Sequence, residues 1–276
     1  GAEAAHRRYV DEHLGTELSD RAVSWLKNRT GTEPFFLYFA PTNIHHPFTP
    51  AQQFVGTSKC GLYGDFVHEL DWMVGNLVSA LKEKNMLDNT LIIFTSDNGG
   101  MLNETGQKAV KAGHALNGDL LGYKFGAWEG GHRVPFIAQW PAKISAGTVS
   151  NQLISQLDLM ATFAKITNQT LPEGQVFDSV NQLDNFMGTA KETARSSLAI
   201  LPNSPKHLSI RHKEWVYIPA QDEGGFQGKK LGHHLFSGAA ALPFSNKQNS
   251  DVLNGKIKKS APKAQLYNLS EDPQQT

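Results

Sequence analysis

Two adjacent polar side chains follow the apolar run LIIFT at residues 91–95. Asp97 offers a carboxylate and Asn98 an amide oxygen, and oxygen ligands of this kind suit Ca²⁺ or Mg²⁺ better than a metal that prefers sulfur. Ligands of open α/β sheets gather at the carboxyl ends of strands, which is where this pair would lie. The same residues are also ordinary turn formers, and their spacing alone favours a Ser-Asp-Asn-Gly turn over a metal site.

Two other loop residues could handle a proton or an anion. His45, in the sequence IHHP, can give or take a proton near neutral pH. Lys124, in GYKFGAWEGGHRVP, can neutralise an oxygen of a sulfate or phosphate group, and the neighbouring glycines allow close approach of the backbone. Taken singly, each is explained more simply as a solvated loop residue. In the same segment Trp128, Glu129 and Arg133 suggest a structural unit that fixes the turn.

The elements that must position these residues alternate between helix and strand. Apolar residues recur at helical spacing in three segments, and three short unbroken apolar runs are typical of buried strands. This alternation predicts an α/β fold. The predicted helices span 17–27, 63–84 and 151–166, and the predicted strands span 35–40, 91–95 and 134–140.

The character of the sequence changes beyond residue 190. Short strand-like pieces, SLAIL, HLSIRH and EWVYIPA, are followed by a segment rich in Gly and Lys and by a final QLYNL. We therefore expect two domains. Residues 1–190 would carry the candidate chemistry, and residues 191–276 would form a small α+β domain with an antiparallel sheet.

Composition indicates a globular protein and excludes some classes of function. Hydrophobic residues make up 39% of the 276 and charged residues 19%, far from the composition of a disordered chain. Lys and Arg balance Asp and Glu at 26 each, so no overall field attracts nucleic acid. No apolar run reaches the roughly 20 residues that a membrane span needs. The single Cys60 cannot form an internal disulfide.

Five blocks of the sequence, in register, closely resemble successive blocks of type I sulfatases, which belong to the alkaline phosphatase-like superfamily. The likeness points especially to the branch that contains arylsulfatase A and N-acetylgalactosamine-6-sulfatase, and it covers nearly the whole chain. It implies a mixed sheet flanked by helices, followed by the small C-terminal domain. The blocks are PFFLYFAPTNIHHPF, YGDFVHELDWMVGNLVSALKEKNMLDNTLIIFTSDNGG, NGDLLGYKFGAWEGGHRVPFIAQWP, SQLDLMATFAKIT and AQLYNLSEDPQQ.

This resemblance implies a role for each of the main candidate residues. Asp97 and Asn98 would be two ligands of a divalent ion, usually Ca²⁺, with Mg²⁺ also possible. His45 would bind the sulfate group and protonate the departing alcohol oxygen. Lys124 would hold a sulfate oxygen and stabilise charge in the transition state. The implied activity is that of a sulfuric ester hydrolase.

The resemblance also implies a substrate and a location. The substrate would be a sulfated small molecule or a sulfated carbohydrate, and His114 and Asn117, in GHALNG, would be weaker candidates for contacts with it. The location would be periplasmic, secreted or lysosome-like. The sequence predicts no nucleic-acid partner and no membrane span, and it does not indicate an oligomeric state.

One part of the family's site has no counterpart in this sequence. Type I sulfatases use a formylglycine made from the Cys or Ser of a C/S-x-P-x-R motif. Cys60 is followed by GLYG, and the nearest imitation, SAPKA at 260–264, has Ala where Arg is required. We therefore expect the chain to be the C-terminal part of a longer sulfatase, with the formylglycine and the remaining metal ligands upstream, and to be inactive by itself.

Two other functions remain open from the sequence. A phosphatase or phosphonate hydrolase of the same superfamily would share the metal and anion-binding residues but use another nucleophile. A non-catalytic binding protein with the same fold would have lost site residues, whereas His45, Asp97, Asn98 and Lys124 are all present. The upstream motif would separate the two enzymes, and convergence of the four side chains on one cleft would argue against the binding protein.

Overall fold

A computed structural model describes residues 10–31 and 33–276 of the chain. The structure divides into two compact units that interleave in the sequence. The first unit comprises the chain up to Asp88 together with Asn103–Leu116. The second comprises Asn89–Leu102 together with Asn117–Thr276. The expected boundary between residues 190 and 191 falls inside the second unit, and the division at that point stays a prediction.

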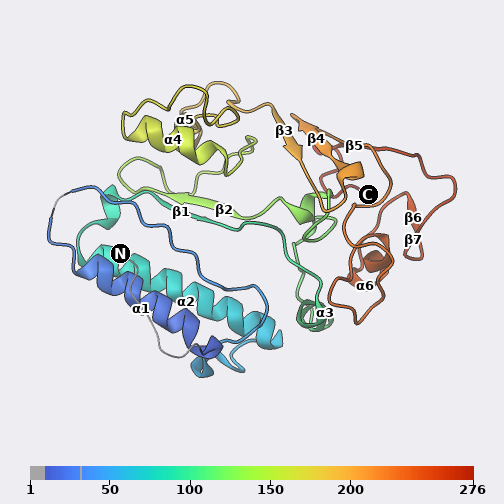
Figure 1. Ribbon diagram of the computed structural model, residues 1–276, viewed down its shortest axis with the longest axis horizontal. Helices are drawn as coiled ribbons and strands as arrows, with labels where there is room; N and C mark the ends of the chain where they lie inside the picture. Colours follow the sequence, from blue (N-terminus) through green and yellow to red (C-terminus); the bar gives the residue numbers. More distant parts are fainter. Residues whose placement is uncertain (1–9, 32) are drawn as a thin grey trace. The chain divides into compact units, whose positions relative to one another are not determined.

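Two packed helices form the frame of the first unit. α1, Leu14–Lys27, lies along α2, Gly61–Glu83 (Figure 1). The short helix α3, Glu104–Lys111, packs on α2 as well. The helices predicted at 17–27 and 63–84 are therefore confirmed, because their apolar stripes become the buried faces of α1 and α2.

The strand predicted at residues 35–40 is wrong. Its apolar run predicted a buried strand, but in the described residues it forms no strand and pairs with none. Phe36 is 72% exposed and Tyr38 81% exposed. A strand needs a neighbour to receive its backbone hydrogen bonds, and apolar composition alone does not supply that neighbour.

The second unit begins with a strand pair. β1, Ile92–Thr95, pairs antiparallel with β2, Phe136–Gln139, so that Ile92 lies opposite Gln139 and Thr95 opposite Phe136. Both predicted strands are confirmed, although in the described structure they pair only with each other. The pair matters for the site because β1 ends directly before Ser96 and Asp97.

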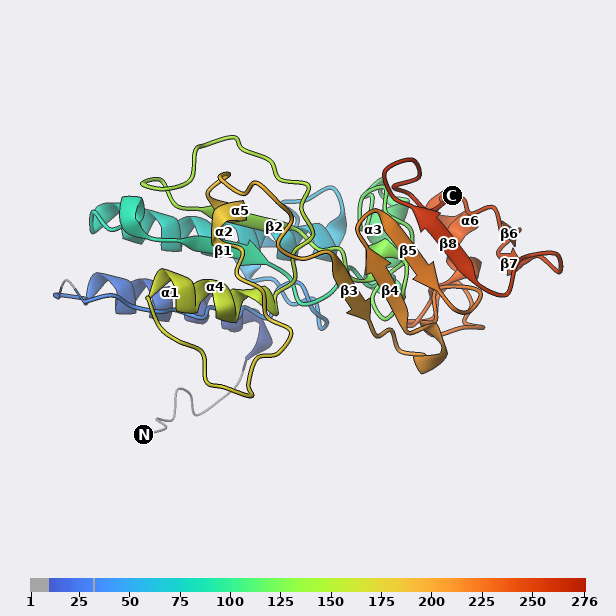
Figure 2. The same ribbon diagram turned by 90° about the horizontal axis from the view of Figure 1, so that it is seen from above.

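A four-stranded antiparallel sheet forms the C-terminal part of the second unit, as expected. Its strands follow the order β3-β4-β5-β8, and Figure 2 shows them side by side. Alternate residues of β5, Val216 and Ile218, are buried in a core that also includes Leu121 and Trp128. The strands are β3 Ser197–Ile200, β4 Ser209–His212, β5 Trp215–Ile218 and β8 Gln265–Asn268, with a separate hairpin of β6 Val252–Leu253 and β7 Lys256–Ile257.

Short helices complete the described chain. α4 spans Asp158–Ile166, so the helix predicted at 151–166 begins later than expected. The remaining helices are α5 Leu183–Phe186 and α6 Leu242–Ser245, and the 3₁₀ helices are Asp11–His13, Gln52–Phe54, Leu87–Asn89, Glu129–Gly131, Pro205–His207 and Ala239–Ala241. Among the described residues, no helix combines the length and the apolar character needed to cross a membrane.

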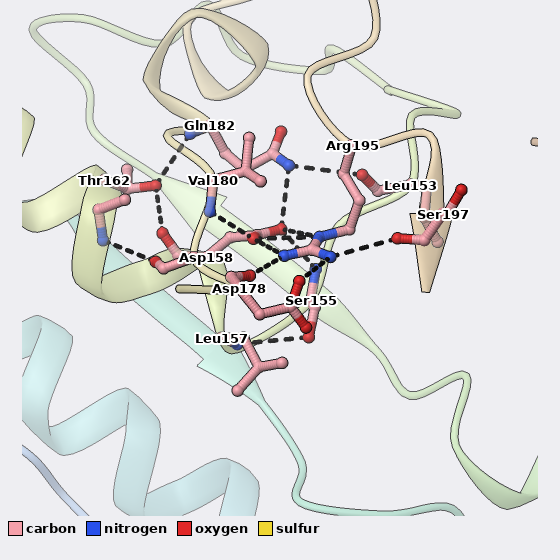
Figure 3. A network of polar contacts seen from close by, with 12 residues as sticks. Leu153, Ser155, Leu157, Asp158, Thr162, Asp178, Val180, Gln182, Arg195 and Ser197 are labelled. Atoms are coloured by element: carbon pink, nitrogen blue, oxygen red, sulfur yellow. Dashed lines mark hydrogen bonds and ion pairs between the residues drawn. The ribbon is translucent and has the colours of Figure 1, made fainter. Parts of the chain in front are cut away.

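A buried ion pair lies at the start of α4. Asp158, its first residue, accepts hydrogen bonds from the N–H groups of Ser155 and Val180 and from the guanidinium of Arg195 (Figure 3). Arg195 Nη2 lies 2.6 Å from Asp158 Oδ1, and Arg195 Nη1 lies 3.1 Å from Asp178 Oδ1. Burial alone would raise the pKa of Asp158, but the hydrogen bonds from Arg195 and the backbone outweigh it and lower that pKa.

Candidate functional site

The turn after β1 presents the predicted metal ligands. Asp97 is exposed, and Asn98 Nδ2 donates a hydrogen bond of 2.9 Å to the carbonyl of Gly99. The following residue is fixed in place, because Gly99 N–H donates to the carbonyl of Gly131 at 3.0 Å. A Cβ at Gly99 would overlap the carbonyl oxygen of Gly130, so only glycine allows this close approach.

The residues of this turn fit a hard cation as two of its ligands. Because the amide nitrogen of Asn98 is committed to Gly99, its oxygen is the end of the side chain that can face an ion. The Asp97 carboxylate is exposed beside it. Ca²⁺ takes about six to eight oxygen ligands, so the pair supplies part of such a shell. Within the described ranges, no group of three or more His, Cys, Asp and Glu side chains is placed to hold a metal.

The Lys124 loop is joined directly to this turn. Lys124 N–H donates a hydrogen bond of 2.9 Å to the carbonyl of Gly100, which is two residues beyond Asn98. The Lys124 side chain is half-buried, and its Nζ lies 5.3 Å from the centre of the Phe125 ring. Within the second unit, the backbone of the predicted anion-binding lysine is thus hydrogen-bonded to the segment that follows the predicted metal ligands.

The buried carboxylate of Glu223 packs against the Lys124 loop and accepts a hydrogen bond from it. Glu223 Oε2 accepts a hydrogen bond of 3.1 Å from Tyr123 N–H, and the Glu223 carbonyl accepts one of 2.6 Å from Ala127 N–H. A Cβ at Gly126 would lie only 2.5 Å from Glu223 Oε2, so the loop sits directly against the acid. Burial and the nearby Asp222 raise the pKa of Glu223 to about 8.

Asn117 lies in the second unit, and its side chain forms hydrogen bonds with backbone groups. Its Oδ1 accepts a hydrogen bond of 2.6 Å from Gly100 N–H, and its Nδ2 donates to the carbonyls of Gly100 and Gly122 at 3.3 and 3.0 Å. Both amide hydrogens are therefore in use. The sequence suggested a contact with substrate, whereas these bonds tie the turn after β1 to the Lys124 loop.

His45 lies in the first unit, on an exposed loop. Its Nδ1 is 2.7 Å from the carbonyl oxygen of His46, and the two imidazole rings stack with centres 4.2 Å apart. Because a carbonyl only accepts, Nδ1 carries the hydrogen of this bond and Nε2 is the nitrogen left for proton transfer. The loop geometry therefore selects the atom of His45 that can do chemistry.

Glu69 of α2 anchors the loop that carries His45. Glu69 Oε2 accepts a hydrogen bond of 3.0 Å from Asn43 Nδ2, and Oε1 accepts one of 3.4 Å from Ala51 N–H. Asn43 also donates to the carbonyl of Phe66 at 3.1 Å. The acid is fully buried, and burial raises its pKa in spite of the hydrogen bonds from Asn43 and Ala51.

His114 shares a buried aromatic neighbour with the same loop. Its ring centre lies 5.3 Å from that of Tyr63, and Tyr63 also packs against Phe48, three residues beyond His45, at 5.5 Å. Burial lowers the pKa of His114, so the neutral ring is favoured. His114 and the His45 loop therefore belong together in the first unit, although no direct contact joins the two histidines in the hydrogen bonds and ring contacts described for them.

Glu129, Arg133 and Trp128 make the structural contacts that the sequence suggested. Glu129 is buried, and its Oε2 lies 3.4 Å from Arg133 and 3.3 Å from Arg211 of β4. Trp128 Nε1 donates a hydrogen bond of 2.8 Å to Gln265 of β8. Burial would raise the pKa of Glu129, but His132 and the two arginines outweigh it and lower that pKa. These contacts fix the loop beyond Lys124 to the C-terminal sheet.

The sequence did not point to Glu69 or Glu223. Each is an ordinary acid by type, Glu69 inside a helical stripe and Glu223 in a segment rich in glycine. Glu223 bonds to Tyr123, which is 100 positions away in the sequence. The one available signal was an acid among residues expected to be buried, since buried carboxylates are uncommon unless they are paired or hydrogen-bonded.

Comparison with known proteins identifies the family. The family model described as Sulfatase matches residues 4–169, which is more than half of the chain. The chain belongs to the sulfatase family. It is 34% identical over 217 residues to an N-acetylgalactosamine-6-O-sulfatase of Bacteroides thetaiotaomicron, a match that covers 78% of this chain and 42% of the relative.

Other sulfatase relatives agree with this assignment. Human Arylsulfatase H is 39% identical over 184 residues, covering 66% of this chain and 32% of the relative. Among solved structures, a Bacteroides thetaiotaomicron protein from work on the metabolism of multiple glycosaminoglycans is similar with a TM-score of 0.77 and 29% identity, over 97% of this chain and 51% of that one. The sulfatase chain described here therefore spans less than half the length of these curated relatives, and its alkaline phosphatase-like α/β fold agrees with the solved structure.

Proposed function

We propose that the protein hydrolyses sulfate monoesters, with a sulfated carbohydrate as the favoured class of substrate and an aryl sulfate as the next. Membership of the sulfatase family and the name of the Bacteroides relative support this proposal. The observation that carries it is the 2.9 Å hydrogen bond from Lys124 N–H to the Gly100 carbonyl, because it joins the backbone that bears the Lys124 ammonium group to the segment that follows Asp97 and Asn98. A periplasmic, secreted or lysosome-like location is part of the proposal.

Asp97 and Asn98 hold a divalent ion in this proposal, with Ca²⁺ favoured and Mg²⁺ as the alternative. Such an ion supplies Lewis-acid stabilisation of sulfate oxygens. The nucleophile is a formylglycine contributed by a segment outside this sequence. The contribution of the present chain is to bind the ion with one carboxylate and one amide oxygen and to hold the sulfate group near them.

Lys124 and His45 contribute an anion contact and a proton. Lys124 binds a sulfate oxygen through its ammonium group, and the half-buried position strengthens that attraction relative to bulk water. His45 delivers a proton from Nε2 to the departing alcohol oxygen, since Nδ1 is held by the His46 carbonyl. These two roles are independent, so loss of either should be visible by itself.

Hydrolysis of 4-nitrophenyl sulfate and of 6-O-sulfated N-acetylgalactosamine by the protein at its natural length tests the proposal. We expect release of inorganic sulfate, and a loss of about 100-fold or more in kcat/KM for Asp97→Ala and for Lys124→Ala. His45→Ala should lower kcat by about 100-fold or more. Lys165→Ala, at an exposed lysine of α4, is the matched control and should leave the rate unchanged.

The two other functions give different results in the same assay. A phosphatase or phosphonate hydrolase would cleave 4-nitrophenyl phosphate or a phosphonate ester faster than the sulfate ester. A non-catalytic binding protein would bind sulfate esters without releasing sulfate. Either result, obtained with folded protein supplied with Ca²⁺, would reject the proposed hydrolysis of sulfate esters.

A further inference from the structure

Asn117 connects two segments that the proposed reaction uses. Its Oδ1 and Nδ2 both bond to Gly100, at 2.6 Å to the nitrogen and 3.3 Å to the oxygen, and Nδ2 also bonds to the Gly122 oxygen at 3.0 Å. Gly100 lies two residues after Asn98, and Gly122 lies two residues before Lys124. One amide side chain therefore bridges the predicted metal turn and the predicted anion loop.

We propose that Asn117 is a positioning residue that sets the placement of Lys124 relative to Asp97 and Asn98. This inference rests on the proposed function, since it assigns no contact between Asn117 and substrate. The Gly100 carbonyl accepts both Asn117 Nδ2 and Lys124 N–H, so the amide and the lysine backbone meet on one oxygen. A carbonyl oxygen has two lone pairs, and both are used in this arrangement.

The backbone of Asn117 is suited to this position. Its φ of 61° lies in the left-handed region, which Asn adopts more readily than most residues. Asn117→Gly would keep this backbone while removing all three side-chain bonds. Asn117→Asp would keep an acceptor for Gly100 N–H but replace the donating nitrogen by an oxygen that faces two carbonyls. Asn117→Gly therefore tests loss of the three hydrogen bonds. Asn117→Asp tests the replacement of the two Nδ2 bonds by repulsion between the new carboxylate oxygen and the two carbonyl oxygens.

Asn254 provides a matched control. It is also left-handed, with a φ of 51°, and it is exposed at the turn between β6 and β7. Asn254→Gly makes the same chemical change at a similar backbone conformation within the same unit. It should leave every measurement below at the wild-type value.

The first measurement is steady-state hydrolysis of 4-nitrophenyl sulfate by the protein at its natural length. We expect kcat/KM to fall by about 10- to 100-fold in Asn117→Gly and in Asn117→Asp, because a small displacement of a catalytic group costs this much. Raising the sulfate ester concentration should recover only part of the rate, since the lysine acts on the transition state as well as on binding.

The second measurement does not depend on turnover. Acylation of the Lys124 amine is followed by mass spectrometry while inorganic sulfate is added in the presence of Ca²⁺. In the wild-type protein sulfate should protect Lys124, and in both Asn117 variants the sulfate concentration for half-protection should rise by about tenfold. Thermal unfolding of each variant is recorded to select folded protein.

Wild-type protection of Lys124 in both Asn117 variants, with wild-type kinetics, would overturn the positioning role. If the wild-type protein hydrolyses no sulfate ester, the proposed function fails, but a shift in sulfate protection confined to the Asn117 variants still supports the bridge. If Asn117→Gly does not fold, Asn117→Asp decides the question alone, since wild-type protection in that folded variant would show that the Nδ2 bonds position nothing.

Discussion

At the scale of single residues, Glu223 is the buried side chain that contacts the Lys124 loop. It receives hydrogen bonds from Tyr123 N–H and Gly238 N–H at its two carboxyl oxygens, at 3.1 and 2.5 Å. Asp222 next to it also has a raised pKa through burial, and burial lowers the pKa of Lys247 to about 8. The loop is therefore built over a group whose charge changes in an accessible range of pH.

The raised pKa of Glu223 predicts how stability depends on pH. Its pKa is about 8 in the folded protein against an ordinary 4.5, so the folded state favours the protonated acid. Stability from this group is present below pH 4.5 and is lost as pH rises toward 8. The free energy of unfolding should fall within this window by about 1.4 kcal/mol for each pH unit.

Denaturant unfolding of the wild type and of Glu223→Gln at several pH values inside and outside this window measures the effect. The variant should lose the part of this dependence that Glu223 supplies, because Gln does not titrate. Asp222 and Glu69, whose pKa values are also raised, are present in both proteins. Lys247, with its lowered pKa, adds an opposite slope only above about pH 8, and it is present in both proteins. Parallel pH curves for the two proteins would show that Glu223 is ionised in the folded state.

At the scale of elements, Arg195 ties α4 to the first strand of the C-terminal sheet. It lies two residues before β3, and it pairs with Asp158 at the start of α4 and with Asp178 in the loop between α4 and α5 (Figure 3). Arg195 Nη1 also donates to the Ser197 carbonyl at 3.2 Å. The arginine thus fixes three segments with one planar group, a task for which Lys lacks the geometry.

Removal of Arg195 should destabilise the protein strongly. Arg195→Ala leaves the buried Asp158 carboxylate without its main partner, which costs about 3 to 5 kcal/mol. Asp158 has a lowered pKa, so this stability is present above the ordinary value of 3.8 and is lost as pH falls below it. Denaturant unfolding at neutral and acidic pH measures both effects.

A double-mutant comparison separates the pair from its surroundings. Asp158→Asn with Arg195→Ala should cost clearly less than the sum of the two single changes, because each single change already removes the interaction between these two side chains. Arg21→Ala, at an exposed arginine of α1, serves as the control for loss of a guanidinium at the surface. Additive costs would mean that the pair contributes nothing beyond the two separate side chains.

The elements that depend on local periodicity could be predicted from the sequence, and those that depend on a distant partner could not. α1 and α2 follow from their apolar stripes, and β1 and β2 from their short apolar runs. The run at 35–40 misled because strand formation needs a pairing neighbour that composition does not reveal. The ion pair that Asp158, at the start of α4, forms with Arg195 is another contact with a distant partner, 37 positions away.

In the candidate site, too, contacts with distant partners could not be predicted from the sequence. Motif resemblance was enough to select Asp97, Asn98 and Lys124, and their placement in one unit is a property of the fold. The bridging role of Asn117 could not be read from GHALNG, because its partners are backbone groups of two other segments. Short motifs therefore indicate candidate side chains, whereas long-range hydrogen bonds determine how those side chains are held in place.

At the scale of the whole molecule, the C-terminal sheet shares its core with the loop to which we assign the anion contact. Leu121 and Trp128, which flank the Lys124 loop, lie in one core with Val216 and Ile218 of β5 and with Tyr267 of β8. Substitutions in this core should therefore alter the conformation of the Lys124 loop. The turn after β1, where we propose the ion, is hydrogen-bonded to the same part of the unit through Gly99 and Gly100, so a bound ion would stabilise the folded second unit as a whole.

Binding of Ca²⁺ should make the protein more resistant to unfolding. An ion that binds the folded state alone adds about 2.7 kcal/mol at a concentration of 100 times its dissociation constant. Asp97→Ala should remove most of this gain, because it deletes the only carboxylate of the proposed ligand pair. Asn98→Ala should reduce it less, since a neutral oxygen is a weaker partner for a divalent ion.

Thermal unfolding with increasing Ca²⁺, and with Mg²⁺ in parallel, measures the effect in the protein at its natural length. Glu173→Ala removes an exposed acid elsewhere in the second unit and should keep the full calcium response. Addition of a chelator should return the wild type to the stability of Asp97→Ala with calcium. An equal calcium response in Asp97→Ala and in the wild type would place the ion somewhere other than the turn after β1.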